Sequence, residues 1–267
     1  MKRFSYGRTA LLVWAALVLI FTLLPVLIVF PFAFNAANYL AFPPSGFSFR
    51  WFESFFADES WTGTALQSLK LAILTTILSV LVGTMAAFAV VRKRMRFGSV
   101  MSTFLLFPMV GPHVVFAVGM FGLFSDLNLT GTTAGLVLAH SLVATPFVYI
   151  NVASRLGTFD HRLEMAAQSL GASPMTSFLR ITAPIISPAI VAGGLFAFLT
   201  SWDEFIVTYF TADPDTQTLP LRIFSGIQYG VDVTTAAAAA MIVSVLVLAI
   251  VLYRLGVVWG NRRMRRS

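Results

Sequence analysis

Two adjacent acidic residues, Asp203 and Glu204, stand within a long apolar stretch of this chain. If that stretch crosses a bilayer, ionisable side chains inside it are costly and usually mark a solute pathway or a polar partner. Counted from Ile185 at 1.5 Å per residue, the pair lies about 27 Å along a helix, near one face of the membrane. We expect these carboxylates either to attract a cation in an outer vestibule or to lie at the interface, satisfied by water or another helix.

The aromatic residues nearby allow the same two interpretations. Trp202 and Tyr209 can hold an amine by cation–π contact. They can equally belong to the belt of aromatic residues at a membrane interface. Trp202, with the two acids, is therefore a candidate for the translocation path.

A third candidate for the path lies where Pro108, Gly111 and Pro112 interrupt an apolar stretch beside His113. Irregular backbone at membrane depth is tolerated where it is buried in protein or lines a cavity, although proline kinks are also common there. His113 and His140 lack metal-ligand spacing or an acidic companion, and the chain has no cysteine. We expect no metal site, no catalytic residues and no cofactor, and we expect both histidines to pack through hydrogen bonds.

The polar, small-residue segment 155–184 predicts a helical hairpin, which we call the hairpin. Asp160 is the expected N-cap of its first helix, and Gly171 occupies the place of a left-handed C-terminal cap. Ser173, followed by a proline in the first helical position, begins a second short helix. Pro184 is expected to close the hairpin where the next apolar stretch begins.

The first helix of the hairpin carries one stripe of mostly small residues. Leu163, Ala166, Ala167 and Leu170 recur at the i, i+3, i+4 and i+7 positions of a helix. A helix that rests on lipid headgroups normally presents bulky Leu, Phe or Trp, whereas small residues allow close docking into a groove. The stripe therefore favours docking into a protein partner.

The composition explains how these residues are positioned. Of 267 residues, 58% are hydrophobic and only 11% are charged, whereas soluble domains carry about 25% charged residues. Stretches of about 20 apolar residues can span a bilayer, and six stretches qualify. They are about 10–34, 66–91, 99–124, 135–154, 185–210 and 236–259. The sequence thus predicts one all-α integral membrane domain with six transmembrane helices.

The placement of charge predicts the orientation of the spans. Basic residues gather at positions 2–8, 92–96 and 262–266, on the side that also carries the hairpin. Cytoplasmic loops collect Lys and Arg, so both termini and the hairpin are expected in the cytoplasm. The first apolar run is too long for a signal peptide and is expected to stay as a span. The net charge of +7 reflects topology and anionic lipid rather than nucleic acid.

The hairpin resembles the EAA loop of binding-protein-dependent ABC importer permeases, whose pattern is Glu-Ala-Ala, three residues, Gly, nine residues, Ile, one residue, Leu-Pro. The positions in register are Ala166, Ala167, Gly171, Ile181 and Pro184. The chain departs from the pattern at Met165, where the family has Glu, and at Ala183, where it has Leu. Glu164 stands one place early and is the candidate for the acidic role.

Three further segments resemble the spermidine/putrescine-type subfamily of these permeases. They are Phe49-Arg50-Trp51-Phe52, Ser201-Trp202-Asp203-Glu204-Phe205 and Thr218-Leu219-Pro220-Leu221. The resemblance implies a type I importer permease in a bacterial inner membrane. It also implies a second permease subunit, two ABC ATPase subunits that bind the hairpin, and a periplasmic solute-binding protein. The chain contains no Gly-Lys pair and hence no Walker A loop, which agrees with ATP hydrolysis on a separate protein.

The solute is less determined than the class of transporter. The acids suit a polyamine such as spermidine or putrescine, but similar permeases serve opines, amino-acid derivatives, phosphonates or ferric iron. An ion-coupled secondary transporter would usually show internal repeats with matching helix breaks, and none is found here. A membrane enzyme would need convergent catalytic groups within the spans, which the sequence lacks.

Overall fold

The computed structural model describes the backbone of residues 6–92, 97–229 and 233–264 and the side chains of residues 10–92, 97–228 and 233–256. Of the basic clusters at 2–8, 92–96 and 262–266, only Arg92 has a described side chain. The described backbone is helical apart from turns, loops and one isolated bridge, which confirms the all-α class. The elements are α1 (Tyr6–Ala33), α2 (Arg50–Ala57), α3 (Glu59–Ala87), η1 (Phe88–Arg92), α4 (Gly98–Val110), α5 (His113–Asp126), α6 (Thr133–Gly157), α7 (Arg162–Ser169), α8 (Pro174–Ser177), η2 (Phe178–Thr182), α9 (Ala183–Trp202), α10 (Ile206–Thr211), η3 (Pro214–Thr216), α11 (Leu219–Tyr229) and α12 (Thr234–Met264).

Five helices in the described part of the chain are long and apolar enough to cross a membrane. The spans predicted at 10–34, 135–154 and 236–259 coincide with α1, α6 and α12. The span predicted at 66–91 is α3 followed by the π-helical segment η1, and it begins earlier than expected, at Glu59.

The stretch predicted as one interrupted span, 99–124, is two helices, α4 and α5, bent by 108° at their junction. Counted together they would make a sixth span within the described residues. The bend has a local cause: Gly111 is extended (φ −76°, ψ 157°) because a residue before proline avoids the helical region. Pro112 also lacks the N–H that a continuous helix would need.

The predicted fifth span, 185–210, differs from the structure at both ends. The short helix α8 continues through the π-helical segment η2 into α9, so Pro184 lies inside a continuous helix and does not close the hairpin. A proline removes one helical hydrogen bond, and a π turn just before it accommodates that loss. At the other end α9 stops at Trp202, and three residues separate it from α10.

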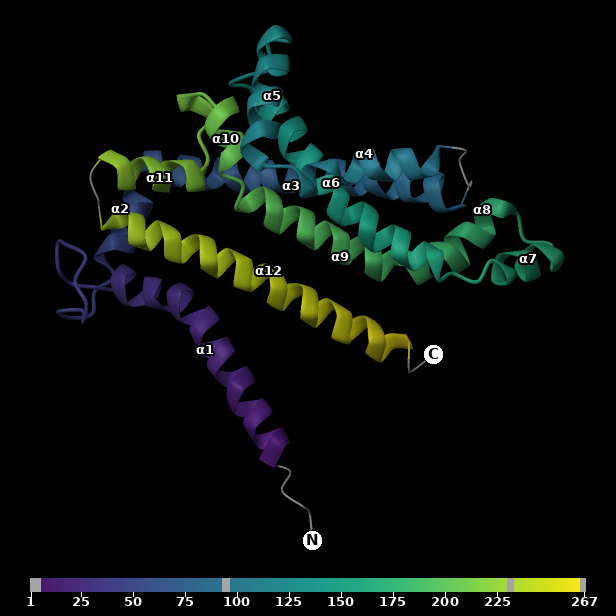
Figure 1. Cartoon of the computed structure of the whole chain (residues 1–267), viewed down its shortest axis with the longest axis horizontal. Coiled ribbons are helices and arrows are strands. Elements are labelled where there is room, and N and C mark those ends of the chain that lie inside the picture. The colour runs from purple at the N-terminus through teal and green to yellow at the C-terminus, as the bar shows by residue number, and fades with distance from the viewer. Residues whose placement is uncertain (1–5, 93–96, 230–232, 265–267) are drawn as a thin grey trace. The chain divides into compact units, whose positions relative to one another are not determined.

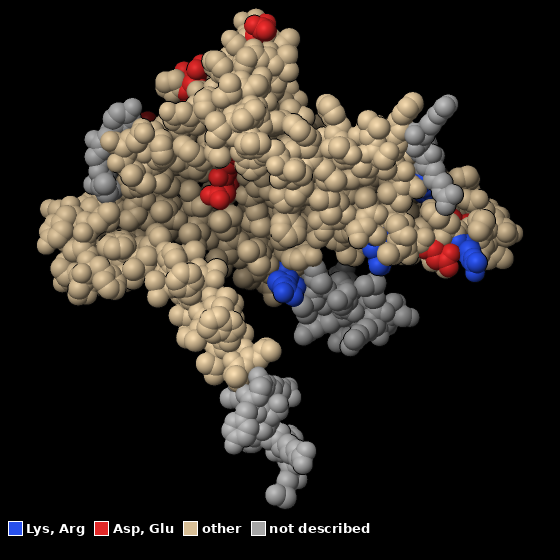
Figure 2. Space-filling model, viewed as in Figure 1, with Lys and Arg blue, Asp and Glu red and all other residues tan. Residues whose placement is uncertain are grey.

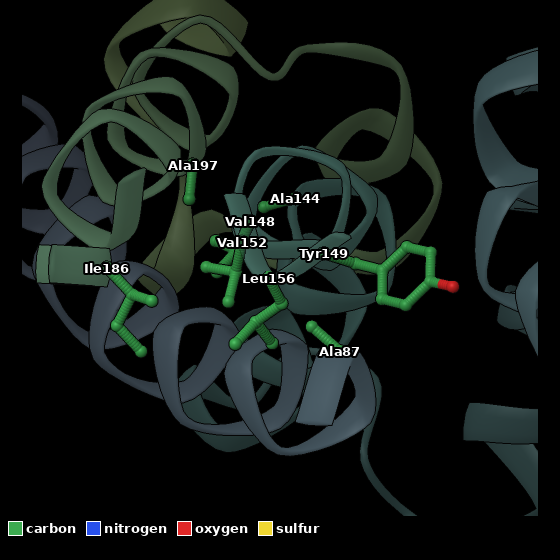
Figure 3. Close-up of a cluster of buried hydrophobic side chains, with 8 residues drawn as sticks. All are labelled: Ala87, Ala144, Val148, Tyr149, Val152, Leu156, Ile186 and Ala197. Atoms are coloured by element: carbon green, nitrogen blue, oxygen red, sulfur yellow. The ribbon is translucent and has the colours of Figure 1, made fainter. Parts of the chain in front are cut away.

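The chain divides into two compact units, residues 1–62 with 222–245 and residues 63–221 with 246–267. In the second unit α6 and α9 lie side by side, with the α7–α8 hairpin at one end and α10 at the other (Figure 1). The buried cluster of Figure 3 joins α3, α6 and α9, with Val148 and Val152 of α6 at its centre.

Glycines allow these three helices to approach closely. A Cβ added at Gly83 of α3 would lie 2.8 Å from Val148 Cβ, and one added at Gly193 of α9 would lie 2.8 Å from Val148 Cα. Close approach at small residues is the usual basis of helix association in membranes. Val148 is thus held between two glycines from different helices.

In the first unit, α1 exposes the side chains of its apolar segment. The loop after it is organised by the fully buried Asn35, whose Oδ1 accepts the N–H groups of Ala37 and Ser45. Trp51 donates its indole N–H to the Asn35 carbonyl at 2.8 Å, and the Arg50 guanidinium lies 4.3 Å from the Trp51 ring centroid. The motif predicted at 49–52 therefore fixes α2 to this loop.

Charged side chains are sparse on the face drawn in Figure 2, and several of them lie at the end that carries α7 and α8. Many large apolar side chains are exposed along α1, α3, α4, α5 and α12. Such apolar surface needs lipid or a protein partner to cover it.

Candidate functional site

The first helix of the hairpin, α7, begins with a turn built on Asp160. The Asp160 Oδ1 atom accepts the N–H of Arg162 at 2.9 Å, but His161 occupies the N-cap position and makes no capping bond. The prediction of Asp160 as the N-cap was therefore wrong by one residue. Its carboxylate still satisfies a free N–H at the start of the helix.

The end of α7 confirms the cap predicted at Gly171. Gly171 has φ +91° and donates its N–H to the Gln168 carbonyl at 3.0 Å, while Ala172 donates to the Ala167 carbonyl at 3.0 Å. These two bonds define a Schellman motif, in which a left-handed glycine ends the helix. The chain can therefore reverse between α7 and α8 within a few residues.

The second helix begins as the sequence predicts. Ser173 Oγ accepts the N–H of Thr176 at 3.1 Å, with Pro174 in the first helical turn. The two remaining motif positions lie in the continuous helix that follows. Ile181 is half-buried in η2, and Pro184 is exposed in the first turn of α9.

The small-residue stripe of α7 faces outward. Leu170 is 90% exposed and Leu163 46%, Ala166 is exposed, and Ala167 is half-buried. Met165, which stands where the motif has Glu, is also exposed. A helix with its apolar stripe uncovered has a surface suited to docking.

Glu164 differs from the rest of α7 because it is buried, with 5% of its surface exposed. Its Oε2 forms an ion pair with Arg92 at the end of η1, and its Oε1 accepts the hydroxyl hydrogen bond of Thr182 at the end of η2. His161 Nδ1 lies 4.0 Å from the same carboxylate. Arg92 and Thr182 were not predicted as partners of Glu164, because they lie 72 and 18 positions away in the chain and no local spacing links them to it.

The second set of predicted residues lies at the break between α9 and α10. Asp203 ends α9 and is exposed, whereas Glu204 is buried and turns back into the protein. The Glu204 Oε1 atom accepts the N–H of Val207 at 2.9 Å and so caps the start of α10. The two adjacent acids therefore have different surroundings.

His140 of α6 holds both sides of this break. Its Nδ1 lies 2.9 Å from Ser201 Oγ at the end of α9, and its Nε2 lies 2.9 Å from Thr208 Oγ1 in α10. The ring is fully buried, and Thr208 also donates to the Glu204 carbonyl at 3.1 Å. This agrees with the expectation of a hydrogen-bonded packing histidine.

The other two candidates for the path are placed less centrally. Trp202 is buried and stacks on Phe198, with 6.2 Å between ring centroids. His113 is exposed in the first turn of α5, within electrostatic range of Glu204. The structure thus brings His113 towards Glu204 but leaves the Trp202 ring covered.

The backbone break at Gly111 lines a cavity of about 860 Å³ between α4, α5 and α6. Its walls are mostly apolar and include Pro108 and Pro112, with Thr103 and Thr145 among the few polar residues. This supports the interpretation of the break as cavity-lining. Among the described residues no three potential metal ligands lie together.

Comparison with known proteins agrees with these features. Residues 79–266 match the family described as binding-protein-dependent transport system inner membrane component. The chain is 34% identical over 228 residues to the spermidine/putrescine transport system permease protein PotC of Haemophilus influenzae, covering 85% of this chain and 88% of that protein. It is 32% identical over 240 residues to the putrescine transport system permease protein PotI of Escherichia coli strain K12, covering 86% and 85%.

The fold is also found in a solved transporter. A bacterial ABC transporter that imports the acidic polysaccharide alginate has a chain that superposes with a TM-score of 0.67 at 16% identity, covering 98% of this chain and 96% of that one. Its complex with an alginate-bound periplasmic protein gives a TM-score of 0.61 at 18% identity. Together, the family match, the relatives and the fold show that this chain belongs to the binding-protein-dependent transport system inner membrane components, as an inner-membrane permease subunit of an ABC importer.

Proposed function

We propose that this chain forms, with a second permease subunit, the path by which an ABC importer carries a polyamine into the cell. The observation that carries the proposal is the similarity, over more than four fifths of the chain, to permeases named for spermidine and putrescine. The alginate importer shares the fold at much lower identity and so carries no weight for the solute.

Two ATPase subunits supply the energy, and one of them binds the hairpin of this chain. The exposed stripe on α7, ended by the tight turn at Gly171, supports this assignment because docking needs an uncovered and well-defined helix surface. The basic clusters of the sequence support a cytoplasmic position for the hairpin and both termini. A periplasmic solute-binding protein delivers the polyamine from the other side.

Asp203 is the residue that best suits contact with an ammonium group. Its carboxylate is exposed at the α9–α10 break, and the exposed Tyr209 lies in the adjoining helix. Glu204 is engaged in capping α10, and the buried Trp202 ring stacks on Phe198. We therefore narrow the pathway candidates to Asp203 and to His113, which lies within electrostatic range of the neighbouring Glu204.

The test is uptake by a reconstituted complex. This chain, its second permease and the ATPase are placed in proteoliposomes with the binding protein, and uptake of radiolabelled spermidine and putrescine is measured with ATP and with a non-hydrolysable analogue. We expect uptake that needs both ATP and the binding protein.

Two results would overturn different parts of the proposal. Import of an opine, amino-acid derivative, phosphonate or ferric iron in place of polyamines would refute the solute while leaving the ABC role. Uptake by this chain without the ATPase, driven by an ion gradient, would refute the ABC mechanism.

A further inference from the structure

Two π-helical segments stand where the hairpin meets the long helices of its unit. η1 continues α3 over Phe88–Arg92, and η2 leads into α9 over Phe178–Thr182. A π turn carries one residue more than a regular helical turn, and such turns recur at functional sites and at kinks. Within the described residues these are the π-helical segments of the chain.

The two π segments contact each other at their first residues and are joined by Glu164 at their last residues. The rings of Phe88 and Phe178 meet edge to face, with 5.7 Å between centroids. Arg92 and Thr182, the last residues of the two segments, bind different oxygens of the Glu164 carboxylate. One side chain of α7 thus connects both π segments by directional bonds.

Because Glu164 is buried, breaking its bonds to Arg92 and Thr182 is energetically costly. A carboxylate removed from water is costly unless it is paired and hydrogen-bonded, and removal of one partner leaves the other uncompensated. Glu164 is buried, whereas its neighbours Leu163 and Met165 are exposed. Glu164 therefore binds α7 to η1 and η2 by polar contacts, while the outer face of α7 stays exposed.

We propose that Glu164 is a positioning residue that transmits movement of α7 to α3 and α9 through the two π segments. The inference rests on the proposed function, because it assigns to the ATPase the force that moves α7. Apolar contacts alone allow packed helices to slide, whereas an ion pair and a hydrogen bond fix the register of α7 against both segments. Glu164 thus serves inside the protein, and the outer face of α7 is left for docking.

The experiment uses the complete reconstituted complex and counts spermidine imported per ATP hydrolysed. We expect Glu164→Gln and Arg92→Gln each to keep the ATPase bound and to lower import per ATP about tenfold, within the usual range of coupling between sites. Because both residues act in one connection, import per ATP in the double variant should be no lower than in the more impaired of the two single variants. Arg254→Gln, which removes an exposed arginine of α12 outside the hairpin, is the charge-matched control and should resemble the wild type.

A second pair of variants distinguishes loss of the hydrogen bond to Glu164 from misfolding. Thr182→Val removes the hydroxyl that binds Glu164 and should lower import per ATP severalfold, whereas Thr182→Ser keeps it and should restore coupling. Wild-type import per ATP in Glu164→Gln, additive losses in the double variant, or equal import by the Val and Ser variants would each overturn the role of Glu164. A wild-type complex without ATP-dependent spermidine import would instead overturn the proposed function.

Discussion

Glu164, Asp203 and Glu204 carry the same functional group in three different surroundings. Glu164 is buried against Arg92 and Thr182, Glu204 is buried and caps a helix, and Asp203 is exposed at a helix end. The sequence identified Asp203 and Glu204 because acids are rare within an apolar stretch, and Glu164 because it stands one place before the motif glutamate position. It left open which acid faces outward, since burial and partners depend on residues far away in the chain.

We predict that loss of charge at Asp203 and at Glu204 has different effects on the KM for polyamine uptake. Asp203→Asn should raise the KM for polyamine uptake about threefold, the usual worth of an exposed ion pair. Glu204→Gln should leave the KM unchanged, because the amide oxygen can still accept the Val207 N–H. Uptake kinetics in proteoliposomes measure both values. An equal rise in the two variants would show that Glu204 also faces the solute.

Gly171 gives a second prediction, which concerns backbone conformation alone. A Cβ at this position would meet no atom within 4 Å, so the strain of a substitution comes only from φ +91°. Gly171→Val should lower the free energy of unfolding by about 1–3 kcal/mol. It should also reduce the amount of ATPase that co-purifies with the chain. Gly171→Asn should fall between Gly and Val, because asparagine tolerates the left-handed region.

Gly157→Val is the matched control for Gly171→Val. A Cβ added at position 157 would also meet no atom within 4 Å, but the backbone there does not have a positive φ. Normal ATPase binding and solute-stimulated hydrolysis in Gly171→Val would refute the docking role of the hairpin.

The apolar helices follow from hydropathy in their approximate place, but not in their breaks. α1, α6 and α12 lie where apolar stretches predict them. The 108° bend between α4 and α5 was anticipated only as an interruption, since a proline marks a break without fixing its angle. The end of α9 was missed because a hydropathy pattern does not register a side chain such as Glu204 that caps the next helix from within.

The packing of α3, α6 and α9 around Val148 leads to a prediction about stability. Gly193→Ala would place a Cβ 2.8 Å from the Val148 Cα, a backbone atom that cannot move aside alone. We expect a loss of about 1–3 kcal/mol, seen as a lower midpoint of thermal unfolding in detergent.

Gly119→Ala serves as the control, because no atom lies within 4 Å of a Cβ there. It should be neutral or stabilising by up to about 1 kcal/mol, since alanine favours a helix more than glycine does. Equal midpoints for the two variants would contradict the close approach of α6 and α9.

For the whole molecule, the distribution of charge predicts the orientation in the membrane. A net charge of +7 in a chain with 11% charged residues is concentrated in a few clusters. Because cytoplasmic loops collect Lys and Arg, these clusters predict that both termini and the hairpin face the cytoplasm. The family and the fold were predictable because the hairpin motif and the apolar stretches are local patterns. The contacts of Glu164 with Arg92 and Thr182, and those of His140, were not, since they join residues 18 to 72 positions apart.

Orientation can be tested by labelling single introduced cysteines, because the chain has none of its own. A cysteine at Leu170, which is 90% exposed, should react with a membrane-impermeant maleimide only in inside-out vesicles. A cysteine at the exposed Asp126 should react only in right-side-out vesicles. The unmodified chain is the blank, and the reverse pattern would invert the topology.

The uninterrupted course of α9 from the π segment to the break at Asp203 has a mechanical consequence. Its 20 residues form one continuous helix, which is about 30 Å long at 1.5 Å per residue. Pivoting this helix by about 10° at η2 would swing the Trp202 end through about 5 Å, by the geometry of a helix of that length. The helix is then a lever with its fulcrum at the π turn, and a small movement of the hairpin becomes a large displacement at the acidic break.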